Sequence, residues 1–492
     1  VLLWLPLAFG VAGLFAPGVA TRIVATTGAL ATLAYAIVLA FDYDGAARGL
    51  QFVIDKPWIS ELGIHYKIGA DGLNLALVLL AAVLFAASTA WAATTDWERP
   101  RLFFFWLALA ETGVLGALLS QDLALFVIFF DVMLVPFVFL AVSGPAPPGP
   151  DRIAGVVKLF IYTLVGSLLM LAAAIATGVL APGEGLTFDL AQLAQRRLPN
   201  GTQDWVFLCF AAAFLVKMPS FPFHGWMPDG YRAMPLPVLA VFSGILSKVA
   251  AYGFLRIALP LFPHAAAHYQ TLMLLIALAS VLYGSAMAFT TTDTRLILGY
   301  SSVAQLGFIT LGVFSLTDQG AQGALLQSVN HGLVVAPAFF IVALLGRRAG
   351  SEDLRAMGGL AFRAPVLATL FLIVALANLA MPGSSNFVGE FLILLGVFQT
   401  KIVIAIIAFT GVALASVYTL RLFVRSMHNR QAAGVESREI SVRDGLVLVP
   451  LVVAILALAL YPQLPLARAE NAVKAAVAPA KTAAQPAREA SR

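Results

Sequence analysis

Uninterrupted apolar runs of about 20 residues recur along almost the whole chain, and they restrict its fold more than any other feature. A helix needs about this length to cross the hydrocarbon core of a bilayer. The composition agrees, because 61% of the 492 residues are hydrophobic and only 11% are charged. A membrane β-barrel would show a weaker, alternating pattern. The sequence therefore predicts an all-α integral membrane protein and excludes a soluble catalytic domain.

Cysteine usage and net charge narrow the chemistry further. The single cysteine, Cys209, can form no intrachain disulfide, and one thiol cannot hold an iron–sulfur cluster or a structural zinc site. We therefore expect no cofactor and no metal bound by this chain. The net charge of +5 could indicate nucleic acid, but the basic residues lie in loops between spans, where they report membrane topology instead.

Polar breaks between the apolar runs predict about fourteen transmembrane helices, and an even number places both termini on one side of the membrane. The loops of one face are rich in arginine: Arg22, Arg99, Arg101, Arg152, Arg232, Arg295, Arg347, Arg348, Arg355, Arg363, Arg425 and Arg430. The loops of the other face contain few basic residues, chiefly Arg48, Lys56, Lys67, Arg196 and Arg197. Because basic loops stay in the cytoplasm, we expect both termini on the outer, periplasmic side of a bacterial inner membrane.

Two of the predicted spans are interrupted at the same dipeptide, Met-Pro. One contains "KMPSFPFHGW", with Pro219 and Pro222, and the other contains "AMPGSSNFVGEF", with Pro382 and Gly383. Matching interruptions in two halves of a chain indicate inverted repeats with an ion site at their interface. Proline is also tolerated in membrane helices generally, so coincidence stays an alternative.

The interruptions divide the chain into four expected parts. Three N-terminal spans occupy residues 1–100, and a first group of five spans, broken at 217–223, occupies 101–262. A second group of five, broken at 381–387, occupies 263–428, and the last span with a polar tail occupies 429–492. The tail is rich in alanine and proline, and we expect it to be loosely ordered or to form a short surface helix.

Ionisable residues inside the apolar runs are the strongest functional signal. An ionisable group near the bilayer centre costs at least about 2.5 kcal/mol, so each one needs a reason. Six such side chains lie deep in predicted spans: Glu111, Asp131, Lys217, Lys248, His331 and Glu390. Hard cations prefer clusters of oxygen ligands, and lysines would repel them. A buried chain of acid, lysine, histidine and acid therefore suits proton transfer better than metal chemistry.

Structural alternatives exist for each of these residues. Asp131 and Lys217 could form a buried ion pair that only fastens two helices, although such pairs rarely stabilise more than apolar packing does. A lone histidine such as His331 is more often a core residue, and Glu111 could simply bind a neighbouring helix. Lys158 lies close to the start of its span, and its amine can reach the membrane surface.

The chain resembles the antiporter-like membrane subunits of respiratory complex I, an NADH–quinone oxidoreductase, and most closely their chain M (subunit 4) branch. The resemblance covers nearly the whole chain and is strongest in "GADGLNLALVLL", "DLALFVIFFDVMLVPFVFL", "KLFIYTLVGSLLML", "FLVKMPSFPFHGWMPDGY", "SGILSKVAAYGFLRIALPLFP", "YSSVAQLGF" and "NFVGEFLIL". It implies a fourteen-helix core with two inverted five-helix repeats, each containing a broken helix, and a proton route along the central axis.

The family's functional positions map onto residues of this chain. Asp131 takes the place of the acidic partner that controls the broken-helix lysine, which is Lys217 here. Lys248 matches the central lysine, His331 the histidine of the next repeat, and Glu390 the ionisable residue of the second broken helix. Glu111 corresponds to a further family acid.

This chain departs from the family pattern at two positions. Asp131 stands where the family has glutamate, and its side chain is one methylene shorter, so water could bridge it to Lys217. Gln305 replaces a histidine, and an amide can orient water but does not titrate near neutral pH.

The resemblance implies a proton-translocating subunit of NADH:quinone oxidoreductase, with neighbouring antiporter-like subunits as partners and internal water as the proton carrier. NADH, FMN, iron–sulfur clusters and quinone would then bind other subunits. Three alternatives stay open: a subunit of a multisubunit cation/proton antiporter, a membrane-bound hydrogenase module, and a structural spacer whose embedded charges only fasten helices.

Overall fold

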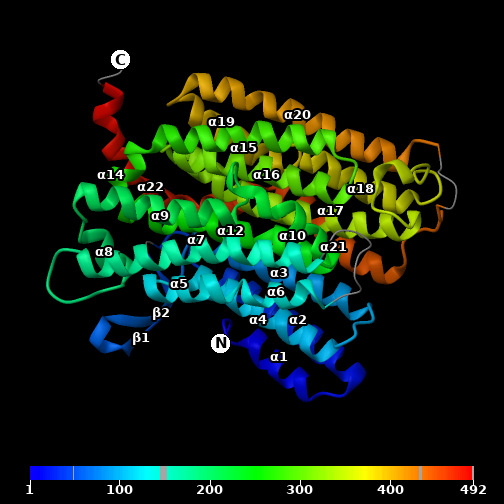
Figure 1. The fold of residues 1–492 in the computed structure, drawn as a ribbon, viewed down its shortest axis with the longest axis horizontal. Helices are drawn as coiled ribbons and strands as arrows, with labels where there is room; N and C mark the ends of the chain where they lie inside the picture. The colour runs from blue at the N-terminus through cyan, green and yellow to red at the C-terminus, as the bar shows by residue number, and fades with distance from the viewer. Residues whose placement is uncertain (48, 144–151, 431–434, 490–492) are drawn as a thin grey trace.

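The computed structural model describes residues 1–47, 49–143, 152–430 and 435–489 as a bundle of helices that lie side by side (Figure 1). Arg48, which enters the topology argument, and the last three residues of the tail lie outside this part of the chain. The prediction of a mostly helical membrane protein is confirmed.

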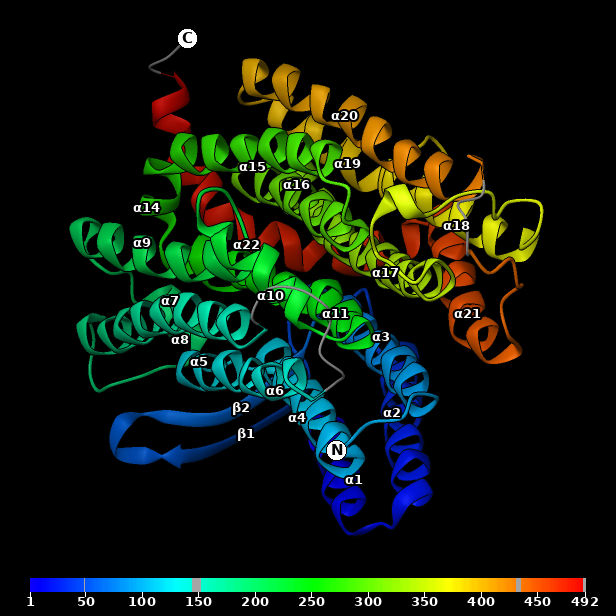
Figure 2. The ribbon, with the colours of Figure 1, turned by 45° about the vertical axis from the view of Figure 1, so that its right-hand side comes forward.

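The N-terminal part contains helices and one hairpin. In order, the elements are α1 (Leu5–Phe15), α2 (Gly18–Asp42), β1 (Gln51–Ile59), the short helix η1 (Ser60–Leu62), β2 (Ile64–Ala70) and α3 (Leu75–Ala93). The two strands pair antiparallel and project from the bundle (Figure 2). This hairpin was not predicted from the sequence, because its strands lie in a connection between apolar runs and carry mixed polar and apolar residues.

The next part ends in several short, irregular helices. Its elements are α4 (Pro100–Leu119), α5 (Leu123–Val132), α6 (Val135–Ala141), α7 (Arg152–Leu180), α8 (Leu190–Gln195), α9 (Asn200–Lys217), η2 (Phe223–Trp226), α10 (Met227–Ala233), α11 (Leu236–Val241), η3 (Phe242–Leu246), α12 (Ser247–Gly253), η4 (Phe254–Ala258) and α13 (Leu259–Leu261). The segments η3 and η4 are π-helical turns within one continuous helical span, residues 236–261. Asp122 caps α5 by accepting hydrogen bonds from two backbone amides of its first turn.

The following part contains the longest central helix. Its elements are α14 (Pro263–His268), α15 (Gln270–Thr290), α16 (Thr294–Phe314), α17 (Asp318–Ala349), η5 (Leu354–Ala356), α18 (Pro365–Asn378), α19 (Ser385–Phe398) and α20 (Ile402–Met427). Asp293 caps α16 and Thr317 caps α17, while Gly350 ends α17 in the left-handed conformation that favours glycine.

The C-terminal part corrects one expectation. After α21 (Val442–Leu460), the tail forms α22 (Gln463–Glu489), a helix of 27 residues and not a loose or short segment. Val473, Val477, Ala480 and Ala484 are buried against the bundle. Their spacing of three and four residues places them on one face of a helix, and this apolar stripe is hidden in a polar overall composition.

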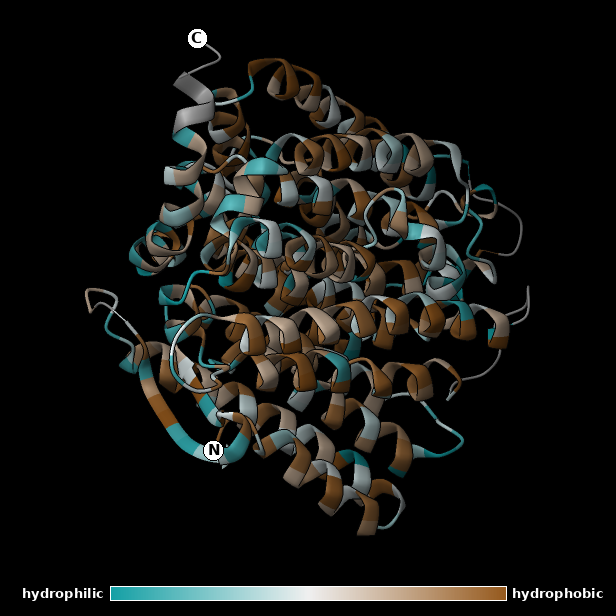
Figure 3. Cartoon of the chain, turned by 60° about the vertical axis from the view of Figure 1, so that its left-hand side comes forward, coloured by the Kyte–Doolittle hydropathy of each residue, from teal (hydrophilic) through white to brown (hydrophobic). Residues whose placement is uncertain are grey.

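Three segments form the centre of the bundle. The apolar windows of residues 236–261 and α16 are 100% buried and that of α17 is 94% buried, whereas those of α2 and α21 are each 28% buried. Hydrophobic residues cover the helices, and hydrophilic residues concentrate in the connections and in the hairpin (Figure 3). A polar side chain on a central segment is therefore shielded from lipid and from bulk water.

The count of fourteen transmembrane helices stays a prediction. Among the described residues, eleven helices are long and apolar enough to cross a membrane, and three apolar helices are shorter. Two of these shorter helices, α18 and α19, belong to one predicted span, and α9 is not among the fourteen helices so counted. The inverted symmetry of the two five-helix groups likewise stays a prediction.

Candidate functional site

Lys248 lies in the middle of the buried central span. Its side chain is 0% exposed, and its Nζ donates a hydrogen bond to the Ser243 carbonyl oxygen at 2.7 Å. Ser243 belongs to η3, and a π-turn shifts the ordinary i to i−4 hydrogen bonding by one residue, so that carbonyls become available to side chains. Among the described residues, no carboxylate forms a salt bridge with Lys248.

His331 approaches the same point from α17. It is 0% exposed and lies within electrostatic range of Lys248. The next residue, Gly332, faces Gly244 of η3 so closely that a Cβ on Gly332 would lie 2.5 Å from the Gly244 carbonyl oxygen. The two glycines therefore permit the contact between α17 and η3 that holds the histidine near the lysine.

Asp131 and Lys217 form a second pair. Lys217 is the last residue of α9 and is 6% exposed, and its Nζ lies 3.5 Å from Asp131 Oδ1. The same Nζ donates to the Phe130 carbonyl oxygen at 2.5 Å and lies 3.7 Å from the centroid of the Phe130 ring. Ser167 donates a hydrogen bond to Asp131 Oδ1. Aspartate thus reaches Lys217 directly, but at the long end of ion-pair distances, and the lysine shares its charge with a carbonyl and an aromatic face.

The first helix break explains why Lys217 ends its helix. The prolines Pro219 and Pro222 follow it, and neither can donate the backbone hydrogen bond that would continue α9. The indole of Trp226 donates to the Val216 carbonyl at 2.9 Å, so a side chain satisfies one backbone acceptor that the break leaves free. The interruption predicted at 217–223 falls where α9 ends at Lys217 and η2 starts at Phe223, so residues 218–222 lie outside both helices.

The second break lies between α18 and α19. The helices end at Asn378 and resume at Ser385, so the break covers residues 379–384, and the predicted limits of 381–387 were about two residues too late. Pro382 and Gly383 lie inside it as expected, and Gly383 has a φ of 91°, which favours glycine. The shift arises because α18 ends before the Met-Pro dipeptide that marked the break in the sequence.

Glu390 on α19 ends a chain of buried amides. Gln305 of α16 donates to Glu390 Oε1 at 2.7 Å, and Gln327 of α17 donates to Gln305 Oε1 at 2.7 Å. Glu390 is 2% exposed and both glutamines are 0% exposed. Gln305, noted in the sequence because it replaces a histidine, is therefore a direct partner of the buried acid. Gln327 was missed, because an amide in an apolar run is less conspicuous than a charge.

Several polar atoms around His331 and Glu390 are buried without a hydrogen-bond partner among the described residues. They are both ring nitrogens of His331, Glu390 Oε2, Gln327 Oε1, Asn330 Oδ1, and both side-chain polar atoms of Asn386. A buried polar atom normally finds a partner in protein or ordered water. This cluster therefore suits hydration and, with it, proton movement between the central span and the second break.

Serines of α16 connect the clusters. Ser302 lies 3.3 Å from Ser243, hydroxyl to hydroxyl, next to the carbonyl that binds Lys248. Ser301 donates to the Tyr418 hydroxyl at 3.2 Å and accepts from Asn378 at 3.2 Å, at the end of α18. With Gln305 one turn further on, α16 presents polar groups towards the central lysine and the second break.

Two candidates lie apart from this buried line. Glu111 is 2% exposed on α4, and its surroundings include residues of α1 and α2, such as Phe9 and Gly28. Lys158 is half-buried near the start of α7 and pairs with Asp229 at 2.7 Å. Lys158 therefore lies at the arginine-rich end of the bundle, where it lines the same cavity as Arg152 and Arg232.

Comparison with known proteins identifies the family of this chain. Residues 120–415 match the family model described as "NADH:quinone oxidoreductase/Mrp antiporter, TM". The NADH-quinone oxidoreductase subunit M of Rhodobacter capsulatus is 35% identical, covering 90% of this chain and 87% of the relative. The subunit M of Escherichia coli is 37% identical, covering 84% and 82%.

Solved structures agree with the sequence relationship. A chain of respiratory complex I from Thermus thermophilus superposes with a TM-score of 0.86 at 30% identity, covering 96% of this chain and 98% of the other. A chain of the Mrp complex from Dietzia has a TM-score of 0.82 at 22% identity, which establishes a common fold only. The chain therefore belongs to the family of NADH:quinone oxidoreductase and Mrp antiporter membrane subunits, in its subunit M branch.

Proposed function

We propose that this chain is the antiporter-like membrane subunit M of a bacterial NADH:quinone oxidoreductase and that it translocates protons. The redox chemistry takes place in other subunits, which bind NADH, FMN, iron–sulfur clusters and quinone. Neighbouring antiporter-like subunits and internal water are its partners. This chain contributes the translocase step of the enzyme and no redox centre of its own.

One observation carries the proposal: Lys248 is fully buried on the central span and bound to a backbone carbonyl, with His331 in electrostatic range. A buried ammonium without a carboxylate partner is a poor structural fastener, because it bears the desolvation cost without the compensating attraction. The arrangement suits a group that gains and loses a proton. A structural spacer could therefore account for the ion pair of Lys217 and Asp131, which would fasten two helices, but it does not account for the burial of Lys248.

The relay that we propose runs from Asp131 and Lys217 through Lys248 and His331 to Glu390. The helix breaks beside Lys217 and Glu390 leave backbone groups without helical hydrogen bonds, and water that enters the membrane span can bind these groups. Gln305 and Gln327 orient water and hold Glu390 but do not titrate. Moving one charge against about 100 mV takes roughly 2.3 kcal/mol, which is within the range that opening or closing one buried ion pair can supply.

The orientation of the relay follows from the basic residues. A surface cavity of about 1110 Å³ at one end of the bundle is lined by Arg152, Lys158, Arg232, Arg295 and Arg347. The four arginines come from the loops that the sequence predicts to be cytoplasmic, and Lys158 lies near the start of its span. We propose that this end faces the cytoplasm and that both termini face the periplasm.

The antiporter and hydrogenase alternatives share the fold, and the Dietzia neighbour illustrates this at 22% identity. The relatives at 35% and 37% identity are named NADH-quinone oxidoreductase subunit M, and they support complex I as the assembly. Genes for quinone-site and NADH-binding subunits beside this one would agree with complex I, whereas genes for small antiporter subunits would favour the antiporter.

The test uses inverted membrane vesicles with the assembled complex, in which NADH oxidation and acidification of the lumen are measured together. Lys248→Ala should abolish acidification driven through this subunit, and the ratio of protons moved to NADH oxidised should fall. Lys158→Ala is the matched control, because it removes a lysine of the same chain that is half-exposed and off the axis. An unchanged ratio in Lys248→Ala, with the complex assembled, would refute the relay.

A further inference from the structure

Three side chains that can bind a metal ion meet away from the proposed relay. They are Asp204 in the second turn of α9 and His264 and His268 on α14, and their ligand atoms lie within 4.8 Å of one another. The histidines are four residues apart on one helix, so they share a face. The cluster lies near the start of α9 and beside α14, at the opposite end of the bundle from the arginine-lined cavity (Figure 1).

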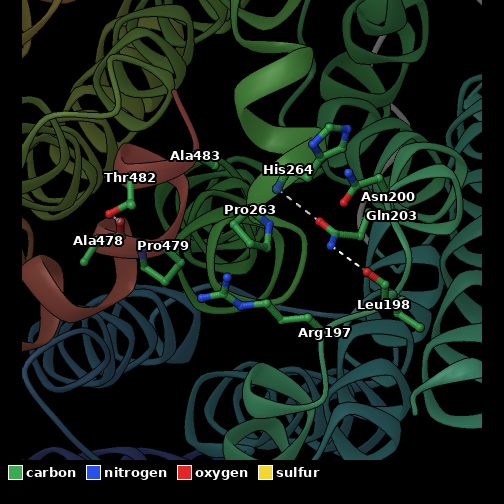
Figure 4. A pocket seen from close by; sticks show the side chains of 10 residues that line it. All are labelled: Arg197, Leu198, Asn200, Gln203, Pro263, His264, Ala478, Pro479, Thr482 and Ala483. Carbon is green, nitrogen blue, oxygen red and sulfur yellow. Dashed lines mark hydrogen bonds between the residues drawn. The ribbon is translucent and has the colours of Figure 1, made fainter. Parts of the chain in front are cut away.

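The backbone around the cluster is fixed by contacts that need no metal. Gln203, which is 2% exposed, accepts a hydrogen bond from the His264 backbone amide at 3.0 Å and donates to the Leu198 carbonyl at 2.8 Å (Figure 4). The first of these bonds joins the first turns of α9 and α14, and the second ties Gln203 to the segment that precedes α9. The two elements that carry the ligands are therefore held in place before any ion binds, which reduces the ordering cost of binding.

A second observation points to a ligand. Asp204 Oδ1 is buried and has no hydrogen-bond partner among the residues that the structure describes. A buried carboxylate oxygen is costly unless a donor or a cation satisfies it. Ring nitrogens of His264 and His268 lie within 4.8 Å of a carboxylate oxygen of Asp204, so an ion that all three residues share can supply that partner.

The surrounding charge permits a cation. The nearby basic residue, Arg197, lines a cavity of about 460 Å³ next to His264. Its guanidinium lies on the side of Pro263 and Pro479, away from the His264 ring (Figure 4). As ligands of a metal ion, one carboxylate and two imidazoles supply a net charge of −1, so a divalent ion meets an attractive site.

We propose that Asp204, His264 and His268 bind one divalent transition-metal ion of the Zn²⁺ class. Imidazole and carboxylate are typical zinc ligands, whereas Mg²⁺ and Ca²⁺ prefer sets of oxygen ligands. Zinc bonds of about 2.0–2.2 Å place tetrahedral ligand atoms about 3.4 Å apart. The three ligand atoms, which lie within 4.8 Å of one another, therefore approach by at most about 1.4 Å on binding. A water molecule completes the coordination.

No metal was expected from the sequence, because its single cysteine and its embedded charges offer no metal-ligand set. The spacing of His264 and His268 was the signal available in the sequence, but it identifies no third ligand. The structure supplies Asp204 from a different helix. An ion there would join α9, which ends at Lys217, to the start of the second five-helix group, whether or not the proposed proton relay is correct.

The experiment uses the full-length chain purified in detergent without a histidine tag and stripped with chelator. Zinc chloride is titrated by calorimetry, and cobalt(II) chloride is followed by its visible absorption, which is intense only in tetrahedral sites. We expect one zinc ion per chain with a dissociation constant in the micromolar range or below. His268→Ala should weaken binding at least tenfold, whereas His268→Cys should retain it. His268 is exposed, so these changes leave folding intact.

Asp204→Asn and His264→Ala should weaken zinc binding to a similar degree. His428→Ala is the control, because His428 packs on Phe423 near the end of α20, remote from α14 in the bundle (Figure 1). The proposal is overturned if zinc does not bind saturably, or if the triple variant Asp204→Asn, His264→Ala, His268→Ala binds zinc as tightly as the unaltered chain.

Discussion

Replacing Gly332 by alanine tests the helix contact that holds His331 near Lys248. The added Cβ would lie 2.5 Å from the Gly244 carbonyl oxygen and 2.7 Å from Leu80 Cδ2. A carbon and a carbonyl oxygen in close contact are normally about 3.3 Å apart. The backbones of α17 and η3 must therefore separate by about 0.8 Å, and overpacking of this kind costs about 1–3 kcal/mol.

Two other glycines of the same chain provide graded controls. A Cβ on Gly244 would meet Leu84 Cδ1 at 2.5 Å, but this atom ends a flexible side chain and can rotate away. A Cβ on Gly201, in the first turn of α9, meets nothing within 4 Å. We expect the midpoint of thermal unfolding to fall most in Gly332→Ala, less in Gly244→Ala, and hardly at all in Gly201→Ala.

The functional assay is the ratio of protons moved to NADH oxidised in inverted vesicles. Gly332→Ala should lower this ratio because it moves His331 relative to Lys248, while Gly201→Ala should leave it unchanged. If Gly332→Ala is as stable and as active as Gly201→Ala, then α17 and η3 do not cross as closely as the structure has them, and the placement of His331 loses its support.

Three further changes probe separate contacts. Gln305→Leu removes the donor to Glu390 and should reduce proton translocation several-fold in the vesicle assay, whereas Gln305→His keeps a donor and should retain most of it. The Arg256 guanidinium lies 2.5 Å from Asp71 Oδ1, and Asp71→Ala would leave it buried without this carboxylate. The loss should lower the free energy of unfolding by about 3–5 kcal/mol. Asp71→Asn keeps an acceptor and should lower it less. Val477→Ala removes two buried methyl groups of α22 and should weaken the packing of this helix on the bundle by about 1.6 kcal/mol. The expected result is faster proteolysis of the C-terminal helix. A proteolysis rate equal to that of the unaltered chain would contradict the docking of α22.

The fold was largely predictable because each membrane span must satisfy its own backbone and bury its own apolar surface. Local sequence therefore determines where the helices and the Met-Pro breaks lie. The hairpin at residues 51–70 and α22 were not predicted, because both depend on contacts that local composition does not reveal. In α22 the buried residues Val473 and Val477 lie among alanines, prolines and charges.

The residues of the candidate site that were easiest to predict are those whose side chains cost the most free energy to bury in a membrane. Lysines, acids and a histidine inside an apolar run are conspicuous, because a charge in the membrane needs a reason. The amides Gln327, Asn330 and Asn386 escaped attention, since a neutral polar residue costs less to insert. The structure places these amides around the second break, next to the ionisable residues.

The contacts of Lys217 indicate how its charge could change during a proton-transfer cycle. Its ammonium lies closer to the Phe130 carbonyl, at 2.5 Å, than to the carboxylate of Asp131, at 3.5 Å. Ser167 already donates to the same Asp131 oxygen, so this carboxylate oxygen is shared between the Ser167 hydroxyl and the Lys217 ammonium. Such an ion pair can open with little loss of free energy. When the two charges separate, Lys217 keeps its hydrogen bond to the Phe130 carbonyl and Asp131 keeps the hydrogen bond from Ser167. In the relay that we propose, Asp131 is an adjustable partner, because an aspartate reaches one methylene less far than the glutamate of the family pattern and meets Lys217 at 3.5 Å.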